Sequence, residues 1–161
     1  MTAFRVGTGW DVHRLVPGRA LVLGGVAVPY ERGLAGHSDG DCLSHAVCDA
    51  LLGAAGAGDM GEHFPSRDPR WKDAPGHVFL QAVARLLAGR GQAIENVDAT
   101  VIAEAPPLAP HLPAMRESLA RALGLASDRV SVKAKSSDGL GALGQGEGIA
   151  AQAAALIRTT T

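Results

Sequence analysis

The sequence predicts an α/β protein of the α+β type, a two-layer sandwich in which a mixed sheet carries helices on one face. Three observations predict it. Segments with apolar residues at helical spacing alternate with segments rich in β-branched residues, no linker or repeat interrupts them, and an early hairpin pattern argues against an all-parallel sheet. We therefore expect a single domain over residues 1–161.

The first segments of the chain favour strands. Residues 4–13 have the alternation typical of a strand, with glycines that allow another backbone to approach closely. Residues 20–23 and 26–29 flank Gly24–Gly25 as the two short strands of a hairpin.

The next segment predicts a helix. Ser38, followed three residues later by Asp41, resembles a capping box, and the apolar run 46–52 supplies the helix body. Residues four apart share a face, so Asp41, His45 and Asp49 align, and one of these carboxylates could orient His45. The alternative is a well-capped surface helix that binds nothing.

The rest of the chain alternates loops, helices and strands. A loop is expected at 59–69, because its prolines and glycines cannot continue a helix. The elements expected after it are a helix from residue 77 that closes at Gly89, a strand at 97–103, a helix at 112–123, a strand at 130–135, a glycine-rich loop at 139–148 and an alanine-rich helix at 149–158.

Composition excludes several classes of partner. The net charge is −1, from 15 basic and 16 acidic residues that are interspersed, so neither nucleic acid nor an anionic membrane is an expected partner. There is no charged leader and no long apolar span, and we expect a cytoplasmic protein. Cys42 and Cys48 are expected to be reduced and buried, because on one helix they cannot easily meet a single ion together with His45.

Three residues form a candidate metal site. On a strand with a period of two, Asp11 and His13 point to the same side, and His45 would join them from the helix. Two histidines and a carboxylate suit zinc, and three protein ligands leave a fourth position open, as catalytic zinc sites do.

The glycine-rich segment 139–148 allows two interpretations. It could expose backbone N–H groups to a phosphate just before a helix, or it could be a plain turn-rich connection that needs no ligand. It is not a Walker A loop, because no Lys-Ser/Thr follows the glycines. Asp138, beside Ser136 and Ser137, offers an oxygen ligand suited to Mg²⁺.

A set of motifs runs in order and nearly from end to end of the chain. The motifs are Gly9-x-Asp11-Val12-His13, Leu23-Gly24-Gly25-Val26, Gly36-His37-Ser38-Asp39-Gly40-Asp41, His45-Ala46, Asp49-Ala50-Leu51-Leu52-Gly53-Ala54, Gly58-Asp59-Met60-Gly61, Asn96-Val97-Asp98 and Gly146-Glu147-Gly148-Ile149-Ala150. Together they resemble the 2-C-methyl-D-erythritol 2,4-cyclodiphosphate synthase family.

The resemblance implies a homotrimeric lyase of the non-mevalonate isoprenoid pathway. Such an enzyme cyclises 4-diphosphocytidyl-2-C-methyl-D-erythritol 2-phosphate and releases CMP. The implied cofactors are a catalytic Zn²⁺ and a second, phosphate-bridging Mg²⁺ or Mn²⁺. Two alternatives remain: a zinc-dependent phosphohydrolase that uses the same three ligands to activate water, and a non-catalytic nucleotide-binding trimer.

The resemblance also implies roles for individual residues. The three residues of the candidate metal site would bind Zn²⁺, and Asp138 would meet the second metal. His37 and Ser136 would be catalytic residues that stabilise the transition state. The implied substrate-binding residues are Ser38, Asp59, Gly61, Phe64, Asp68, Ala103, Pro106, Pro107, Leu108, Ala109, Lys135, Ser137, Ala142 and Gln145.

Some positions depart from the family pattern. Pro107 stands where lysine is usual, Ala142 where an aromatic is usual and Gln145 where arginine is usual, which removes two cations and a ring from the nucleotide side. Asp138 replaces glutamate and Ser136 replaces threonine, and these two keep their chemistry.

The implied site is divided along the chain. The candidate zinc ligands come from its first third, whereas Asp138 and the cytidine-side segment 103–109 come from its last part. The resemblance implies that these halves meet across a subunit boundary.

Overall fold

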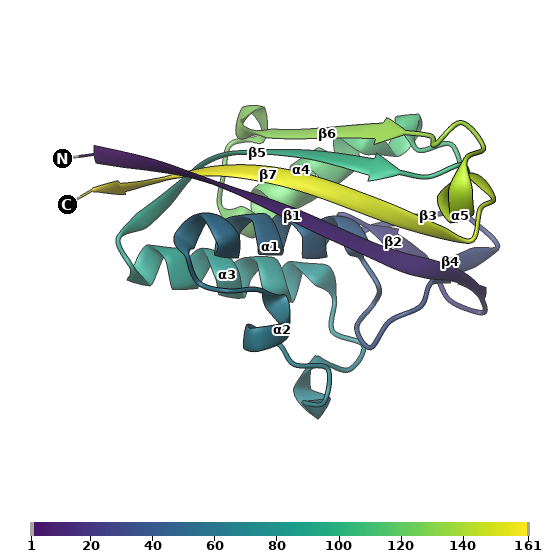
Figure 1. Ribbon diagram of the computed structural model, residues 1–161, viewed down its shortest axis with the longest axis horizontal. Coiled ribbons are helices and arrows are strands. Elements are labelled where there is room, and N and C mark those ends of the chain that lie inside the picture. The colour runs from purple at the N-terminus through teal and green to yellow at the C-terminus, as the bar shows by residue number, and fades with distance from the viewer. Residues whose placement is uncertain (1, 161) are drawn as a thin grey trace.

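The computed structural model describes residues 2–160, with side chains over residues 2–159. Its elements are β1 (Thr2–Pro17), β2 (Leu21–Leu23), β3 (Val26–Val28), β4 (Arg32–Leu34), α1 (Cys42–Ala55), α2 (Met60–His63), α3 (Gly76–Gly89), β5 (Gln92–Ile102), α4 (Leu112–Leu123), β6 (Val130–Lys135), α5 (Gly141–Gly144) and β7 (Gly148–Thr160) (Figure 1).

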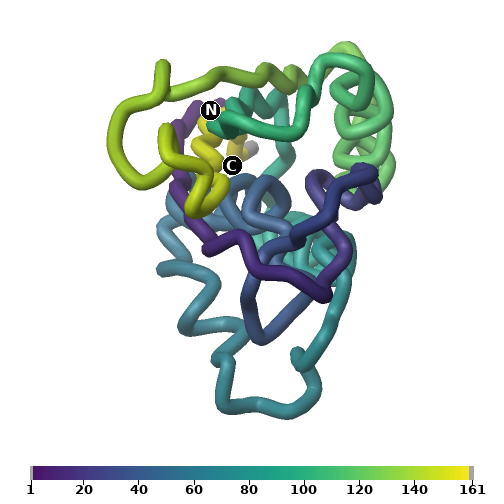
Figure 2. The backbone as a smooth tube through the Cα atoms, turned by 90° about the vertical axis from the view of Figure 1, so that its right-hand side faces the viewer, coloured from purple at the N-terminus to yellow at the C-terminus, as the bar shows by residue number. Residues whose placement is uncertain are grey.

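A five-stranded mixed sheet forms one layer, in the order β4-β1-β7-β5-β6. Strands β5 and β6 run parallel, and the other neighbours pair antiparallel. Helices α1, α3 and α4 lie on one side of this sheet (Figures 1 and 2), so the predicted two-layer sandwich is confirmed. No helix in the described part of the chain is both long and apolar enough to cross a membrane.

The last element is a strand, and the prediction of an alanine-rich helix at 149–158 is wrong. Strand β7 lies in the middle of the sheet between β1 and β5. Its inner face is buried at Ile149, Ala151, Ala153, Ala155 and Ile157, each at most 1% exposed. Alanine favours helices in isolation, but pairing on both sides and burial of every second residue override that weak preference.

Helix α1 lies unusually close to β1. A Cβ on Gly7 would lie 2.1 Å from the carbonyl oxygen of Ala50, and one on Gly9 would lie 2.0 Å from that of Ala46. The glycines of β1 therefore allow the helix backbone to rest directly on the strand, as the sequence pattern suggested.

Smaller differences concern the ends of elements. The cap of α1 is Asp41, not Ser38, because the Asp41 side chain accepts from the backbone N–H of Ser44. The expected loop at 59–69 contains the short helix α2, and the glycine-rich segment contains the single turn α5. The hairpin is confirmed, and β2 and β3 pair as a separate two-stranded sheet.

The face of the sheet opposite the helices carries apolar side chains that nothing covers in the single chain. Phe4, Val6, Trp10 and Val12 alternate along β1 and are between 50% and 70% exposed. Asp11 lies on the other face of the strand, as its spacing predicted. Exposed apolar stripes of this kind are typical of interaction surfaces.

Replacing Gly9 by alanine should destabilise the protein by about 3 kcal/mol or more, because the new methyl group overlaps a helix carbonyl and must push α1 off the sheet. Gly53→Ala is the matched control. Its Cβ would meet only the Thr8 oxygen at 3.8 Å. Because alanine is favoured over glycine within a helix, this change should raise the free energy of unfolding by about 0.5–1 kcal/mol. Urea unfolding at equal protein concentration measures both, and equal effects of the two changes would contradict this packing.

Candidate metal and substrate site

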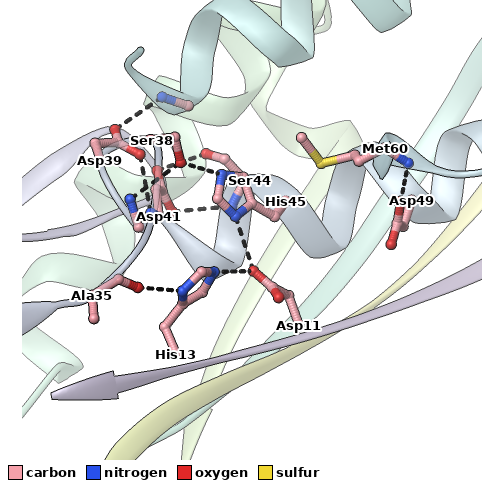
Figure 3. A network of polar contacts seen from close by, with 12 residues as sticks. Asp11, His13, Ala35, Ser38, Asp39, Asp41, Ser44, His45, Asp49 and Met60 are labelled. Atoms are coloured by element: carbon pink, nitrogen blue, oxygen red, sulfur yellow. Dashed lines mark hydrogen bonds and ion pairs between the residues drawn. The ribbon is translucent and has the colours of Figure 1, made fainter. Parts of the chain in front are cut away.

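Asp11, His13 and His45 converge at one point between β1 and α1. Oδ2 of Asp11 lies 2.9 Å from Nε2 of His13 and 2.9 Å from Nδ1 of His45 (Figure 3). The three residues offer ligand atoms that all lie within 4.8 Å of one another. The predicted trio is therefore assembled in a single chain, with ligand atoms close enough together to hold one metal ion.

The outer nitrogen of each histidine has a partner in the segment that precedes α1. Nδ1 of His13 donates to the carbonyl of Ala35, and Nε2 of His45 lies 3.2 Å from Oγ of Ser38. These contacts leave Nε2 of His13 and Nδ1 of His45 facing Asp11. Outer partners of this kind set the tautomer and orientation of metal-binding histidines.

The predicted orientation of His45 by a carboxylate of its own helix is wrong. Asp49 instead accepts from the backbone N–H of Met60 at 2.8 Å. Asp41 turns away from His45 into the protein, where its carboxylate bonds to backbone donors. Residues four apart share a helix face, but the local donors decide where each side chain points.

The charges of the trio hold Asp11 in its ionised form. Burial by itself raises the pKa of Asp11, but hydrogen bonds and charges from His13 and His45 outweigh it and lower that pKa below its usual value. The hydrogen bond to Asp11 raises the pKa of His13, although burial opposes it. The ionised Asp11 carboxylate thus favours positive charge beside it. Protonated histidines can supply that charge, and so can a bound cation.

Asp41 fixes the start of α1 and is fully buried. Its Oδ1 accepts from the backbone N–H groups of Gly24 at 2.8 Å and Ser44 at 3.0 Å. Its Oδ2 accepts from Gly25 N at 2.7 Å and from the Ser44 hydroxyl at 2.7 Å. Burial raises the pKa of Asp41, and these donors oppose that effect. The carboxylate ties the helix that carries His45 to the β2–β3 turn.

A pocket of about 200 Å³ opens beside the trio. It is lined by His13, His37, Ser38, His45, Met60, Phe64, Ser66, Trp71 and Phe79. Phe79 packs its ring 5.0 Å from that of Phe64 and 5.7 Å from that of Trp71, which gives the pocket an aromatic wall. His13, His37, Ser38, His45 and Phe64 of this pocket were predicted from the sequence. Trp71 and Phe79 were not, because their segments meet the others only in the tertiary structure.

Other predicted substrate residues surround this pocket without lining it. Asp59 caps α2 by accepting from the backbone N–H of Glu62 at 3.0 Å, and Gly61 lies within that helix. Asp68 pairs with Arg70 at 2.6 Å, and this contact lowers its pKa. Gly61 and Asp68 lie in the segment 60–75, and Asp59 directly precedes it. This segment projects from the body of the protein at the bottom of Figures 1 and 2.

The predicted nucleotide residues form a second pocket of about 230 Å³. It is lined by Ala103, Glu104, Pro106, Pro107, Leu108, Ala109, Ala134, Lys135 and Ser136. The pocket lies at the carboxyl ends of β5 and β6, where parallel strands bring their following loops together. The structure thus brings residues of the segment 103–109 together with Lys135 and with Ser136, which was predicted to be catalytic. Within one chain this pocket is separate from the metal pocket that His37 lines, and the predicted Ser137 lines neither of the two.

Glu104, which no sequence motif indicated, braces the turn that holds Asp138. Its Oε1 accepts from Ser137 N at 2.7 Å and from Gly139 N at 3.5 Å. Asp138 has a φ of 55° and donates its own N–H to Oγ of Ser136 at 3.3 Å. The carboxylate of Asp138 is left at the surface, on a turn held in a left-handed conformation.

The last two predicted residues lie near α5. Ala142 lines a third pocket, of about 200 Å³, together with Val12 and Arg14 of β1. Gln145 donates to the carbonyl of Gly139 at 3.0 Å, so its amide serves the loop itself. Within one chain, therefore, neither Ala142 nor Gln145 lines the metal pocket. Ala142 shares the third pocket with one member of the trio, His13.

Comparison with known proteins identifies relatives over the whole site. Residues 4–158 match the model of the YgbB family. The chain is 59% identical over 154 residues, 96% of its length and 95% of the relative, to 2-C-methyl-D-erythritol 2,4-cyclodiphosphate synthase of Burkholderia thailandensis.

Solved structures agree with this match. The bifunctional IspDF of Campylobacter jejuni has a TM-score of 0.95 at 36% identity; 99% of this chain is covered, and the chain spans 43% of that protein. A cyclodiphosphate synthase in a CDP-bound form has a TM-score of 0.87 at 40% identity, covering 95% of this chain and 99% of the other. IspF of Plasmodium falciparum in a CDP complex has a TM-score of 0.86 at 29% identity, with 99% and 98% covered.

His13→Ala and His45→Ala should each lower the affinity for Zn²⁺ by more than about 100-fold, because each removes one of three ligands. His111→Ala, a histidine outside this group, is the control. Affinity for Zn²⁺ should also fall as the pH is lowered through the raised pKa of His13, since a proton then competes with the metal. Titration calorimetry with Zn²⁺ at several pH values measures both effects, and full zinc content in either ligand variant would exclude this site.

Proposed function

This chain belongs to the YgbB family, and we propose that it catalyses the reaction for which its 59% identical relative is named, the synthesis of 2-C-methyl-D-erythritol 2,4-cyclodiphosphate. The substrate, 4-diphosphocytidyl-2-C-methyl-D-erythritol 2-phosphate, would cyclise with release of CMP. The observation that carries this proposal is the assembled Asp-His-His trio beside a pocket, in a chain whose matched relatives are cyclodiphosphate synthases.

The trio fits Zn²⁺ as the catalytic metal. Asp11, His13 and His45 supply one oxygen and two nitrogens, and both histidines have their second nitrogen already bonded to the protein. When bound, the ion would polarise a phosphate oxygen and neutralise charge that develops on it. Three protein ligands leave a position for that oxygen.

The chain's own residues would do the remaining work by positioning. The 2-phosphate is already an anionic nucleophile, so no strong general base is needed for in-line attack on the β-phosphorus. His37 and Ser38 line the metal pocket, where an imidazole and a hydroxyl can donate to phosphate oxygens. The aromatic wall gives that side of the pocket an apolar surface, and Asp59 with Gly61 would bind the hydroxyl groups of the methylerythritol.

The second pocket would hold the cytidine half of the substrate. Solved relatives with CDP support a nucleotide ligand. The pocket joins apolar walls from Pro106 and Leu108 to the polar groups of Lys135 and Ser136. Asp138, exposed on its braced turn, would bind a Mg²⁺ or Mn²⁺ that also contacts the diphosphate, because one carboxylate suits a hard cation that keeps water and phosphate ligands.

The two halves would join in a homotrimer. In one chain the metal pocket and the nucleotide pocket are separate. The uncovered apolar stripe of β1 supplies a face for association, and threefold packing of such faces would bring the metal half of one subunit to the nucleotide half of the next. The buried, unbonded Cys42 and Cys48 fit the cytoplasmic location expected from the sequence.

Incubation of purified protein with the nucleotide substrate tests the reaction. We expect CMP and the cyclic diphosphate in equal amounts, and loss of both on addition of a chelator. Open-chain phosphates would instead identify a hydrolase, and substrate binding without turnover would identify a non-catalytic nucleotide-binding protein.

Mixing two inactive variants tests the intersubunit site. Asp11→Ala damages the metal half and Asp138→Ala the nucleotide half, so each homotrimer should be nearly inactive. Refolding an equal mixture should return part of the activity, because some junctions then pair an intact metal half with an intact nucleotide half. Mixed trimers, verified by mass, that remain as inactive as either parent would exclude a site shared between subunits.

A further inference from the structure

The connection between β1 and β2 places an arginine behind the metal pocket. Arg19 donates from Nη1 to the carbonyl of Gly36 at 3.2 Å and from Nη2 to the carbonyl of Ser38 at 2.7 Å. One guanidinium thus holds the two carbonyls that flank His37. In the described part of the chain, no backbone N–H donates to either of these carbonyls.

The segment 35–38 controls several groups of the site at once. The carbonyl of Ala35 accepts from His13, the Ser38 hydroxyl contacts His45, and the His37 imidazole lines the pocket. The segment belongs to neither a helix nor a strand, and its backbone bond to the sheet is at its first residue, where Ala35 N donates to the carbonyl of Arg14 at 2.8 Å. No backbone N–H of the sheet bonds to residues 36–38 in the described part of the chain. A displacement of its backbone would therefore move the His37 ring relative to the metal trio.

The opposite side of the segment is bonded to the end of the projecting segment 60–75. The carbonyl of His37 accepts from Asp73 N at 2.8 Å, and Asp39 N donates to the carbonyl of Ala74 at 3.2 Å. Asp39 also accepts from Gly76 N through Oδ2 at 2.9 Å. Arg19 holds the segment from the body of the protein, while these bonds tie it to the part that projects.

The backbone that carries Arg19 is itself tightly packed. A Cβ on Gly33 of β4 would lie 2.2 Å from the carbonyl oxygen of Ala20 and 2.5 Å from that of Arg19. The turn therefore rests against β4 and provides a fixed base for the guanidinium. A planar fork of donors on a fixed base can hold two carbonyls, whereas a lysine ammonium is a single point donor.

We propose that Arg19 is a positioning residue for the cyclisation, which holds His37 in register with the metal trio through the carbonyls of Gly36 and Ser38. Arg19 does not line the metal pocket, so its effect on the reaction would be transmitted by the backbone that carries His37. The inference rests on the proposed function for its kinetic part, but the placement of the segment can be measured without turnover.

A double-mutant cycle tests the link to His37. Arg19→Ala should lower kcat about 10–100-fold, as removal of a supporting contact typically does, with KM changed less than about threefold. In a His37→Ala background the same change should cost less than about threefold, because the group that Arg19 positions is gone. Arg19→Lys should retain part of the activity. An equal loss in both backgrounds, or no loss in either, overturns the proposal.

Arg5→Ala is the matched control, because Arg5 also donates to a carbonyl, that of Ala54 at 2.6 Å, but at the far end of α1. It should leave kcat unchanged. Hydrogen exchange of a peptide covering residues 35–41 gives the readout that needs no activity. Exchange should be at least about 10-fold faster in Arg19→Ala and unchanged in Arg5→Ala.

The two failures can be told apart. If the wild-type protein forms no cyclic diphosphate, the proposed function is wrong, and the exchange of residues 35–41 still decides whether Arg19 holds the segment in place. Unchanged exchange in Arg19→Ala means that the guanidinium does not hold the segment. Should Arg19→Ala fail to fold, Arg19→Gln, which keeps one amide donor, takes its place in both measurements with the same expected direction.

Discussion

The close contact between α1 and β1 is the constraint on which the site depends. Gly7 and Gly9 have no side chains, and the backbone of the helix occupies the space that two methyl groups would fill. This approach places His45, on the helix, against Asp11 and His13, which follow Gly9 on the same face of β1. A helix held farther away by ordinary side chains could not bring three short ligands within 4.8 Å of one another. The close packing of α1 on β1 is therefore also what brings the three candidate metal ligands together.

The segment before α1 connects that contact to the rest of the pocket. Its end is fixed by the buried carboxylate of Asp41, which joins the helix start to the β2–β3 turn. Its beginning is fixed by Arg19 and by the carbonyl contact to His13. Between these anchors lie His37 and Ser38, whose side chains face the pocket. A segment without regular structure is thus held by side-chain contacts at both ends, which suits a site that must be precise without being part of a sheet.

The separation of the two pockets follows from the topology of the sheet. The metal trio lies where α1 meets β1, whereas the nucleotide pocket lies where the parallel strands β5 and β6 end. Strand β7 stands between them in the sheet. Within one chain the two pockets therefore stay apart, and the shared site proposed above would need a neighbouring subunit. Trp10, within the uncovered apolar stripe of β1, is half exposed because the helices cover only the other face of the sheet.

The sequence alone determined the local features: the shared face of Asp11 and His13, the hairpin at Gly24–Gly25, and motifs specific enough to indicate the family. Each depends on spacing along the chain, which a sequence records directly. Only the tertiary structure decided that residues 149–158 form a central strand, because pairing with β1 and β5 outweighs the helical preference of alanine. It also decided that Ser38 and the carbonyl of Ala35 orient the histidines and that Glu104 braces the turn of Asp138. These contacts join residues distant in sequence, and no local pattern encodes which carbonyl or carboxylate a folded chain will bring to a given donor.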